Sequence, residues 1–109
     1  MVGIINYELG NLGSIQNMLK AIGEKSMISS DAGALASCDK YILPGVGAFD
    51  AGMENLNRLG LSDFIRTDVL KRQIPLLGIC LGMQLLGRKS EEGNCEGLGL
   101  VPFDNVKFA

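Results

Sequence analysis

The stretch Pro75-Leu76-Leu77-Gly78-Ile79-Cys80-Leu81-Gly82-Met83-Gln84-Leu85-Leu86 decides the fold of this 109-residue chain. Its first part, residues 76–79, is an unbroken apolar run after a proline. Such a run predicts a strand that is buried on both faces of a parallel sheet. Its last part, residues 81–86, predicts the first turns of a buried helix. The stretch therefore places a cysteine at a strand-to-helix turn.

Cys80 is the centre of a Gly-x-Cys-x-Gly pattern formed with Gly78 and Gly82. This is the cysteine form of the nucleophile elbow, a turn so sharp that larger flanking side chains would collide with neighbouring backbone. A helix start favours the thiolate through the helix dipole and its unpaired N–H groups. The Leu81 N–H would face the developing oxyanion of an acyl group. The pattern predicts acyl transfer by Cys80, and the alternative is a cysteine that acts as a small buried hydrophobe.

Three stretches of the chain resemble one family. Residues 78–86 resemble the elbow of the class I (triad) glutamine amidotransferases, and Asn6-Tyr7-Glu8-Leu9-Gly10-Asn11-Leu12 and Pro44-Gly45-Val46-Gly47-Ala48-Phe49 agree with it. The family usually has aspartate where this chain has Asn6 and glycine where it has Glu8. Within the family, the chain is most similar to the glutaminase subunits of imidazole glycerol phosphate synthase, which supply ammonia to a cyclase in histidine biosynthesis.

The resemblance implies a flavodoxin-like, three-layer α/β fold with a parallel sheet. It covers all 109 residues, but members of the family are about twice as long, close to the usual size of a single domain. Residues 1–109 are therefore expected to be the N-terminal half of one amidotransferase domain, truncated after the elbow. The histidine and glutamate of the triad are expected beyond residue 109.

The resemblance also implies the roles of the site residues. Cys80 would attack the side-chain amide of glutamine, and backbone N–H groups of Leu81, Val46 and Gly47 would hold the oxyanion. No metal or organic cofactor is implied. From the residues alone, the glycine-rich turn at 44–47 is as consistent with an ordinary strand-to-helix connection as with a functional role.

Two further residues are implied to hold glutamine. Gln84 and Glu92 lie where the family contacts the α-amino and amide ends of the substrate. Gln84 follows Cys80 by one helical turn, so it is expected at the same rim. Without the resemblance, Glu92 would be interpreted as a surface acid.

Composition excludes several functions. The net charge of −2 is scattered along the chain, which argues against nucleic acid or an anionic membrane as a partner. No apolar run reaches the length of a membrane span, and no signal peptide is visible, so a soluble, cytoplasmic protein is expected. Cys38, Cys80 and Cys95 have no metal-ligand or disulfide spacing. The chain contains no histidine, and it is therefore expected to be inactive alone.

The remaining elements alternate between strand and helix. Strands are expected at 2–7, 24–30 and 40–43, and helices at 14–22, 31–36, 49–59 and 61–72. The first strand is expected at the centre of the sheet. Charged residues of the last helix, including Arg66, Asp68 and Arg72, are assigned to its solvated face. A polar loop is expected at 88–94, and a strand is expected to begin at Asn105.

Several alternatives remain open at this point. The missing strands would leave an apolar sheet edge, which predicts self-association or pairing with a complementary fragment. The protein could be a non-catalytic binding or assembly module with an elbow fold. It could also be a cysteine-elbow protein of the flavodoxin-like stress or hydrolase kind, or an amidotransferase that feeds another acceptor, such as a sugar.

Overall fold

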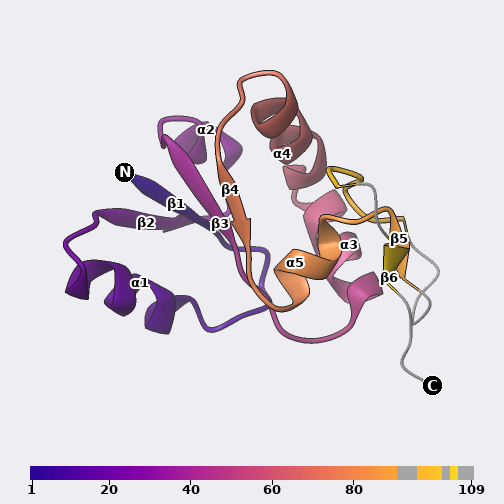
Figure 1. Ribbon diagram of the computed structural model, residues 1–109, viewed down its shortest axis with the longest axis horizontal. Helices are drawn as coiled ribbons and strands as arrows, with labels where there is room; N and C mark the ends of the chain where they lie inside the picture. The colour runs from indigo at the N-terminus through magenta and orange to yellow at the C-terminus, as the bar shows by residue number, and fades with distance from the viewer. Residues whose placement is uncertain (91–95, 102–103, 106–109) are drawn as a thin grey trace.

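The computed structural model describes residues 1–90, 96–101 and 104–105. Four parallel strands form one sheet in the order β2-β1-β3-β4 (Figure 1). The strands are β1 (Val2–Ile5), β2 (Ser26–Ser29), β3 (Lys40–Leu43) and β4 (Leu76–Gly78). β1 lies between β2 and β3, which confirms the prediction of a central first strand.

Helices connect the parallel strands, as parallel pairing requires. The helices are α1 (Leu12–Ala21), α2 (Ala32–Leu35), α3 (Phe49–Arg58), α4 (Leu61–Leu70) and α5 (Leu81–Leu85). A second, two-stranded parallel sheet pairs β5 (Lys89–Ser90) with β6 (Asp104–Asn105). The α/β class is confirmed, and most boundaries lie within two residues of those expected.

Local sequence signals set several of these boundaries. The Asn11 side chain accepts a hydrogen bond from the Ser14 N–H at 3.3 Å and begins α1. Asp31 does the same for α2, accepting from the Ala34 N–H at 3.0 Å. Gly60, with φ +72°, separates α3 from α4. Side chains that accept from the first turn and glycines in the left-handed region are the usual markers of helix ends.

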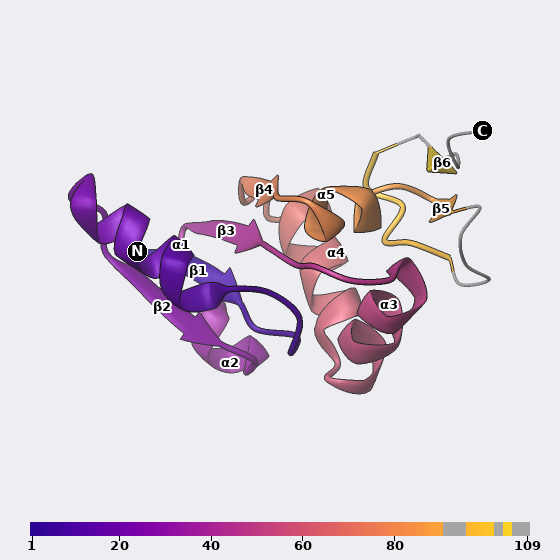
Figure 2. The ribbon, with the colours of Figure 1, turned by 90° about the horizontal axis from the view of Figure 1, so that it is seen from below.

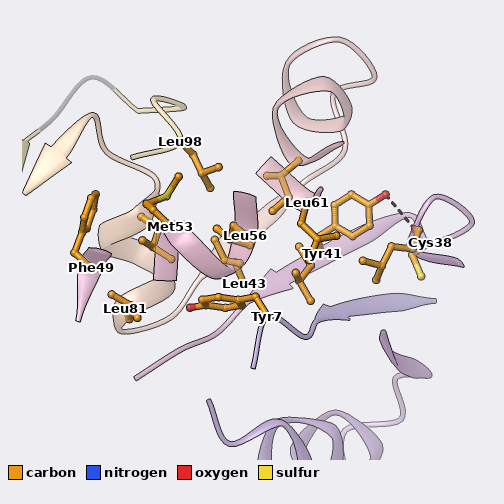
Figure 3. Close-up of a cluster of buried hydrophobic side chains, with 14 residues drawn as sticks. Tyr7, Cys38, Tyr41, Leu43, Phe49, Met53, Leu56, Leu61, Leu81 and Leu98 are labelled. Atoms are coloured by element: carbon orange, nitrogen blue, oxygen red, sulfur yellow. Dashed lines mark hydrogen bonds between the residues drawn. The ribbon is translucent and has the colours of Figure 1, made fainter. Parts of the chain in front are cut away.

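Two apolar cores lie on opposite faces of the sheet, which gives the predicted three layers. On one face, α1 packs Leu19 against Val2, Ile4 and Ile42. On the other face, the helices α2, α3 and α4 cover the strands, and Figure 2 shows α3 and α4 side by side there. Figure 3 shows this larger core, which includes Tyr7, Cys38, Tyr41, Leu43, Phe49, Met53, Leu56, Leu61, Leu81 and Leu98.

The strand before the elbow is not buried on both faces, so that prediction was wrong. β4 is the edge of the described sheet, because it pairs only with β3 among the described residues. The Leu77 side chain is 58% exposed. An unbroken apolar run predicts burial by a partner on each side, but nothing in the part of the chain that the structure describes covers this side chain.

Asp68 is also placed differently from the prediction. It is 4% exposed and accepts hydrogen bonds from the Tyr41 hydroxyl at 2.5 Å and from Arg72 Nη1 at 2.9 Å. Asp68 follows Leu61 and Ile65 at helical spacing, so it lies on the apolar face of α4. The paired contacts offset the cost of burying its charge. In the region predicted as a polar loop, residues 89–90 form β5, while residues 91–95 lie outside the described residues.

Candidate functional site

Cys80 occupies a strained backbone conformation at the elbow. It lies between β4 and α5 with φ +54° and ψ −119°, a combination that non-glycine residues rarely adopt. Its side chain is exposed, whereas Cys38 is buried. Strain of this kind persists only where the surrounding structure imposes it, and it is typical of nucleophile elbows. The structure thus presents the Cys80 thiol at the carboxyl end of the sheet.

The two flanking glycines explain why the turn is possible. A Cβ atom added at Gly78 would lie 2.8 Å from the Met83 Cα atom and 2.9 Å from the Met83 nitrogen. A Cβ atom added at Gly82 would overlap the carbonyl oxygen of Leu43. The backbone leaves no space at either position, so the prediction that both must be glycine is confirmed.

The segment that follows β3 lies directly against the elbow. The Ile79 N–H donates to the Leu43 carbonyl at 3.0 Å, and the Leu81 N–H donates to the Gly45 carbonyl at 3.2 Å. Val46 is 61% exposed. The structure therefore brings the segment that contains Val46 against Cys80 and Leu81, although more than thirty positions separate them in the sequence.

The backbone donors expected for the oxyanion do not converge in this arrangement. The Leu81 N–H is occupied by the Gly45 carbonyl. In a trans peptide the C=O and N–H groups point in opposite directions. The Val46 N–H, which shares a peptide plane with that carbonyl, therefore points away from the Leu81 N–H. Gly47, with φ +116°, adopts a conformation that favours glycine.

Tyr7 contacts this segment at Pro44 and Gly45, and no sequence pattern predicted a role for it. Its side chain is fully buried, and its hydroxyl donates to the Pro44 carbonyl. A Cβ atom added at Gly45 would overlap the Tyr7 hydroxyl. Burial raises the pKa of this hydroxyl above its ordinary value. A tyrosine among the turn-forming residues after β1 was the only sequence signal for this contact.

Helix α3 holds the loop that contains Tyr7 at two points. The Asn55 Nδ2 group donates to the Tyr7 carbonyl at 2.9 Å. Arg58 Nη2 contacts both carboxylate oxygens of Glu8 at 2.7 Å. These contacts join residues about fifty positions apart, so the sequence pattern could not reveal them.

The remaining expected site residues are placed as follows. Gln84 lies in α5, one turn after Cys80, and its side chain is exposed. Glu92 and Cys95 lie outside the described residues. Cys38 is 3% exposed, and burial raises the pKa of its thiol. Among the described residues, no helix is long and apolar enough to cross a membrane.

Comparison with known proteins places these features in a family. Residues 3–107 match the CobB/CobQ-like glutamine amidotransferase domain. The chain is 50% identical over 108 residues to imidazole glycerol phosphate synthase subunit HisH 2 of Methanococcus maripaludis, covering 99% of this chain and 54% of that protein. It is 45% identical over 108 residues to the HisH 2 subunit of Pseudomonas aeruginosa, with the same coverage. The chain thus spans about half the length of the curated relatives that it matches.

A structural comparison agrees with the sequence matches. A crystal structure of a glutamine amidotransferase superposes with a TM-score of 0.78 at 21% identity, covering 94% of this chain and 54% of that chain. At this identity the likeness supports the fold alone. The family itself follows from the match over residues 3–107, and the strained Cys80 turn is consistent with it. The chain belongs to the family of CobB/CobQ-like glutamine amidotransferase domains.

Proposed function

We propose that this chain carries the nucleophile of a glutaminase that supplies ammonia to a synthase subunit, as part of an imidazole glycerol phosphate synthase. The observation that carries the proposal is the exposed Cys80 thiol on a strained turn between two obligatory glycines. Support for the synthase comes from HisH relatives at 45–50% identity. Residues 1–109 would form the N-terminal half of one amidotransferase domain.

The proposed reaction proceeds in two steps. The Cys80 sulfur attacks the side-chain amide carbon of glutamine and forms a tetrahedral oxyanion. The C–N bond then breaks, ammonia leaves with a proton, and a thioester remains. Water hydrolyses the thioester to glutamate and regenerates the thiol. The proton donor would be a histidine outside these 109 residues, because the sequence contains none. The proposal requires no metal or organic cofactor.

Stabilisation of the oxyanion would require a rotation of the Gly45–Val46 peptide. The Leu81 N–H now donates to the Gly45 carbonyl. Rotation would release the Leu81 N–H and turn the Val46 N–H toward the same point, so that two donors converge. The rotation changes ψ of Gly45 and φ of Val46, and the missing side chain of Gly45 lowers the barrier to it.

Substrate binding is proposed at the exposed rim around the elbow. Gln84 would contact glutamine from α5, and Glu92 would contribute the second contact. The synthase subunit that receives ammonia would dock on this same face, so that ammonia is transferred without passing through bulk water. We place the activity in the cytoplasm, where free thiols are kept reduced.

Labelling of the full-length protein, with its synthase subunit bound, tests the proposal. An electrophilic glutamine analogue should add one equivalent to Cys80, and glutamine should protect Cys80 from it. Cys38 provides the matched control, because it is buried and its thiol pKa is raised. Cys80→Ser should abolish release of ammonia from glutamine. Labelling of Cys80 that glutamine does not slow, with no glutaminase activity, would favour a non-catalytic module.

We also propose that the apolar edge of the sheet needs a covering partner. β4 has no second neighbour among the described residues, and Leu77 is exposed. A groove of about 320 Å³ beside it is lined by apolar side chains that include Leu19, Ile42 and Leu76. In the isolated 109-residue chain, a second copy or a complementary fragment would cover this surface.

A further inference from the structure

We propose that Tyr7 is a positioning residue for residues 44–47, the segment expected to stabilise the oxyanion. Its hydroxyl holds the Pro44 carbonyl in place, so that Pro44 is a fixed point, or pivot, next to the Gly45–Val46 peptide. The inference rests on the proposed glutaminase function. The Tyr7 hydroxyl bonds to the Pro44 carbonyl rather than to a reacting atom. It acts through the backbone that carries the Val46 N–H.

Two contacts restrict the position of the Tyr7 hydroxyl: the ring packs in the apolar core, and the backbone carbonyl is bonded to α3. Tyr7 follows β1, the central strand, and its ring lies within the larger apolar core (Figure 3). Its carbonyl accepts the Asn55 Nδ2 donor of α3 at 2.9 Å. The ring therefore has little freedom to move, and its hydroxyl donates to Pro44 from a defined position.

The close approach of Tyr7 also explains the glycine at position 45. Any Cβ atom at Gly45 would overlap the hydroxyl, so the tyrosine reaches Pro44 only because residue 45 lacks a side chain. Gly45 has φ +151°. The pair of Tyr7 and Gly45 thus forms one unit, in which the glycine permits both the contact and the peptide rotation.

The fixed Pro44 carbonyl determines the orientation that the Gly45–Val46 peptide reaches after it rotates. When the Gly45–Val46 peptide turns, the Pro44 carbonyl can remain bonded to Tyr7, since it belongs to the preceding peptide. Without the hydroxyl, the Pro44–Gly45 peptide is free to turn as well, and the Val46 N–H no longer reaches one defined point. Donors at an oxyanion must be positioned before the reaction to be effective. Glutamine binding does not depend on this donor, so the effect falls on kcat.

Two phenylalanine substitutions separate this role from simple loss of a buried hydroxyl. Tyr7→Phe and Tyr41→Phe each remove a buried hydroxyl that lies at a backbone carbonyl, Pro44 in one case and Leu35 in the other. Tyr41→Phe also removes the hydrogen bond to Asp68, so it is the more severe loss of buried hydrogen bonding. The full-length enzyme with its synthase subunit is assayed for glutamine hydrolysis. In Tyr7→Phe, kcat should fall by about tenfold to a hundredfold, the upper value being the loss that a misplacement of 1 Å can cause, while KM stays within about twofold of wild type. Tyr41→Phe should keep the wild-type kcat.

Two further measurements keep the test decisive. Alkylation of Cys80 by iodoacetamide forms no oxyanion, so its rate should be equal in Tyr7→Phe and wild type. If Tyr7→Phe does not fold, Asn55→Ala loosens the same residue and should lower kcat about threefold without changing KM. A wild-type kcat in Tyr7→Phe would overturn the inference and leave the proposed function standing. An inactive wild-type enzyme would overturn both.

Discussion

At the scale of the single residue, Glu8 shows a balance between backbone strain and an ion pair. It has φ +76°, a conformation that favours glycine. Its N–H donates to the Asn6 side chain at 3.1 Å, which closes a short turn that asparagine forms readily. Both carboxylate oxygens of Glu8 contact Arg58. The ion pair is half exposed, so it contributes at most about 1 kcal/mol.

Two substitutions of Glu8 should separate these effects. Glu8→Ala keeps the strained backbone and loses the ion pair, so the free energy of unfolding should fall. Glu8→Gly also loses the pair but relieves the strain, which costs about 1–2 kcal/mol for a non-glycine residue. We expect Glu8→Gly to be more stable than Glu8→Ala by about 1 kcal/mol in urea denaturation. Equal stabilities would show that φ at this position carries no cost.

At the scale of the element, the turn from β4 to α5 depends on close contact with the end of β3. Gly82, in α5, packs against the Leu43 and Pro44 carbonyls, and Ile79 and Leu81 donate to the same segment. The turn and residues 43–44 at the end of β3 therefore form one closely packed unit of backbone. If a side chain inside this unit becomes larger, the surrounding backbone cannot move to make room for it.

Gly82→Ala should destabilise the fold and disturb the site together. The new methyl group would overlap the Leu43 carbonyl, and overpacking of this kind costs about 1–3 kcal/mol. Gly13→Ala is the matched control, since Gly13 lies in α1 with no atom within 4 Å of the added Cβ. It should stabilise the helix by about 0.5–1 kcal/mol. Thermal denaturation of both variants measures the difference, and equal melting temperatures would contradict the tight packing at Gly82.

At the scale of the whole molecule, the uncovered edge of the sheet should control association. Leu77 is 58% exposed on the edge strand β4. Lysine on an edge strand opposes pairing with another chain. In sedimentation across a wide concentration range, the 109-residue chain should associate, and Leu77→Lys should shift it toward monomer. Met18→Lys is the control, because Met18 is 56% exposed on α1 and away from this edge. A chain that is monomeric at all concentrations would contradict the prediction.

Local patterns predicted much of the fold. Apolar runs and their spacing indicated each strand of the main sheet and each helix. Asp31 and Gly60 marked helix boundaries that the structure confirms, whereas α1 begins at Leu12, two residues before the expected start at residue 14. The Gly-x-Cys-x-Gly pattern predicted the turn at Cys80, and the steric demand at Gly78 is local, since it comes from Met83 a few positions later. The demand at Gly82 comes instead from the Leu43 carbonyl, which only the tertiary structure brings to this position.

The sequence by itself determined the alternation of strands and helices and the position of Cys80 at the turn between β4 and α5, because these depend on spacing along the chain. Only the tertiary structure decided that β4 lies at an edge, that Asp68 is buried beside Tyr41, and that the Leu81 N–H is occupied by Gly45. It also placed Tyr7 beneath Pro44, a contact across 37 positions. Such contacts depend on how separate elements pack against one another, and hydrophobic periodicity specifies which face of an element is buried but not which residue it meets there.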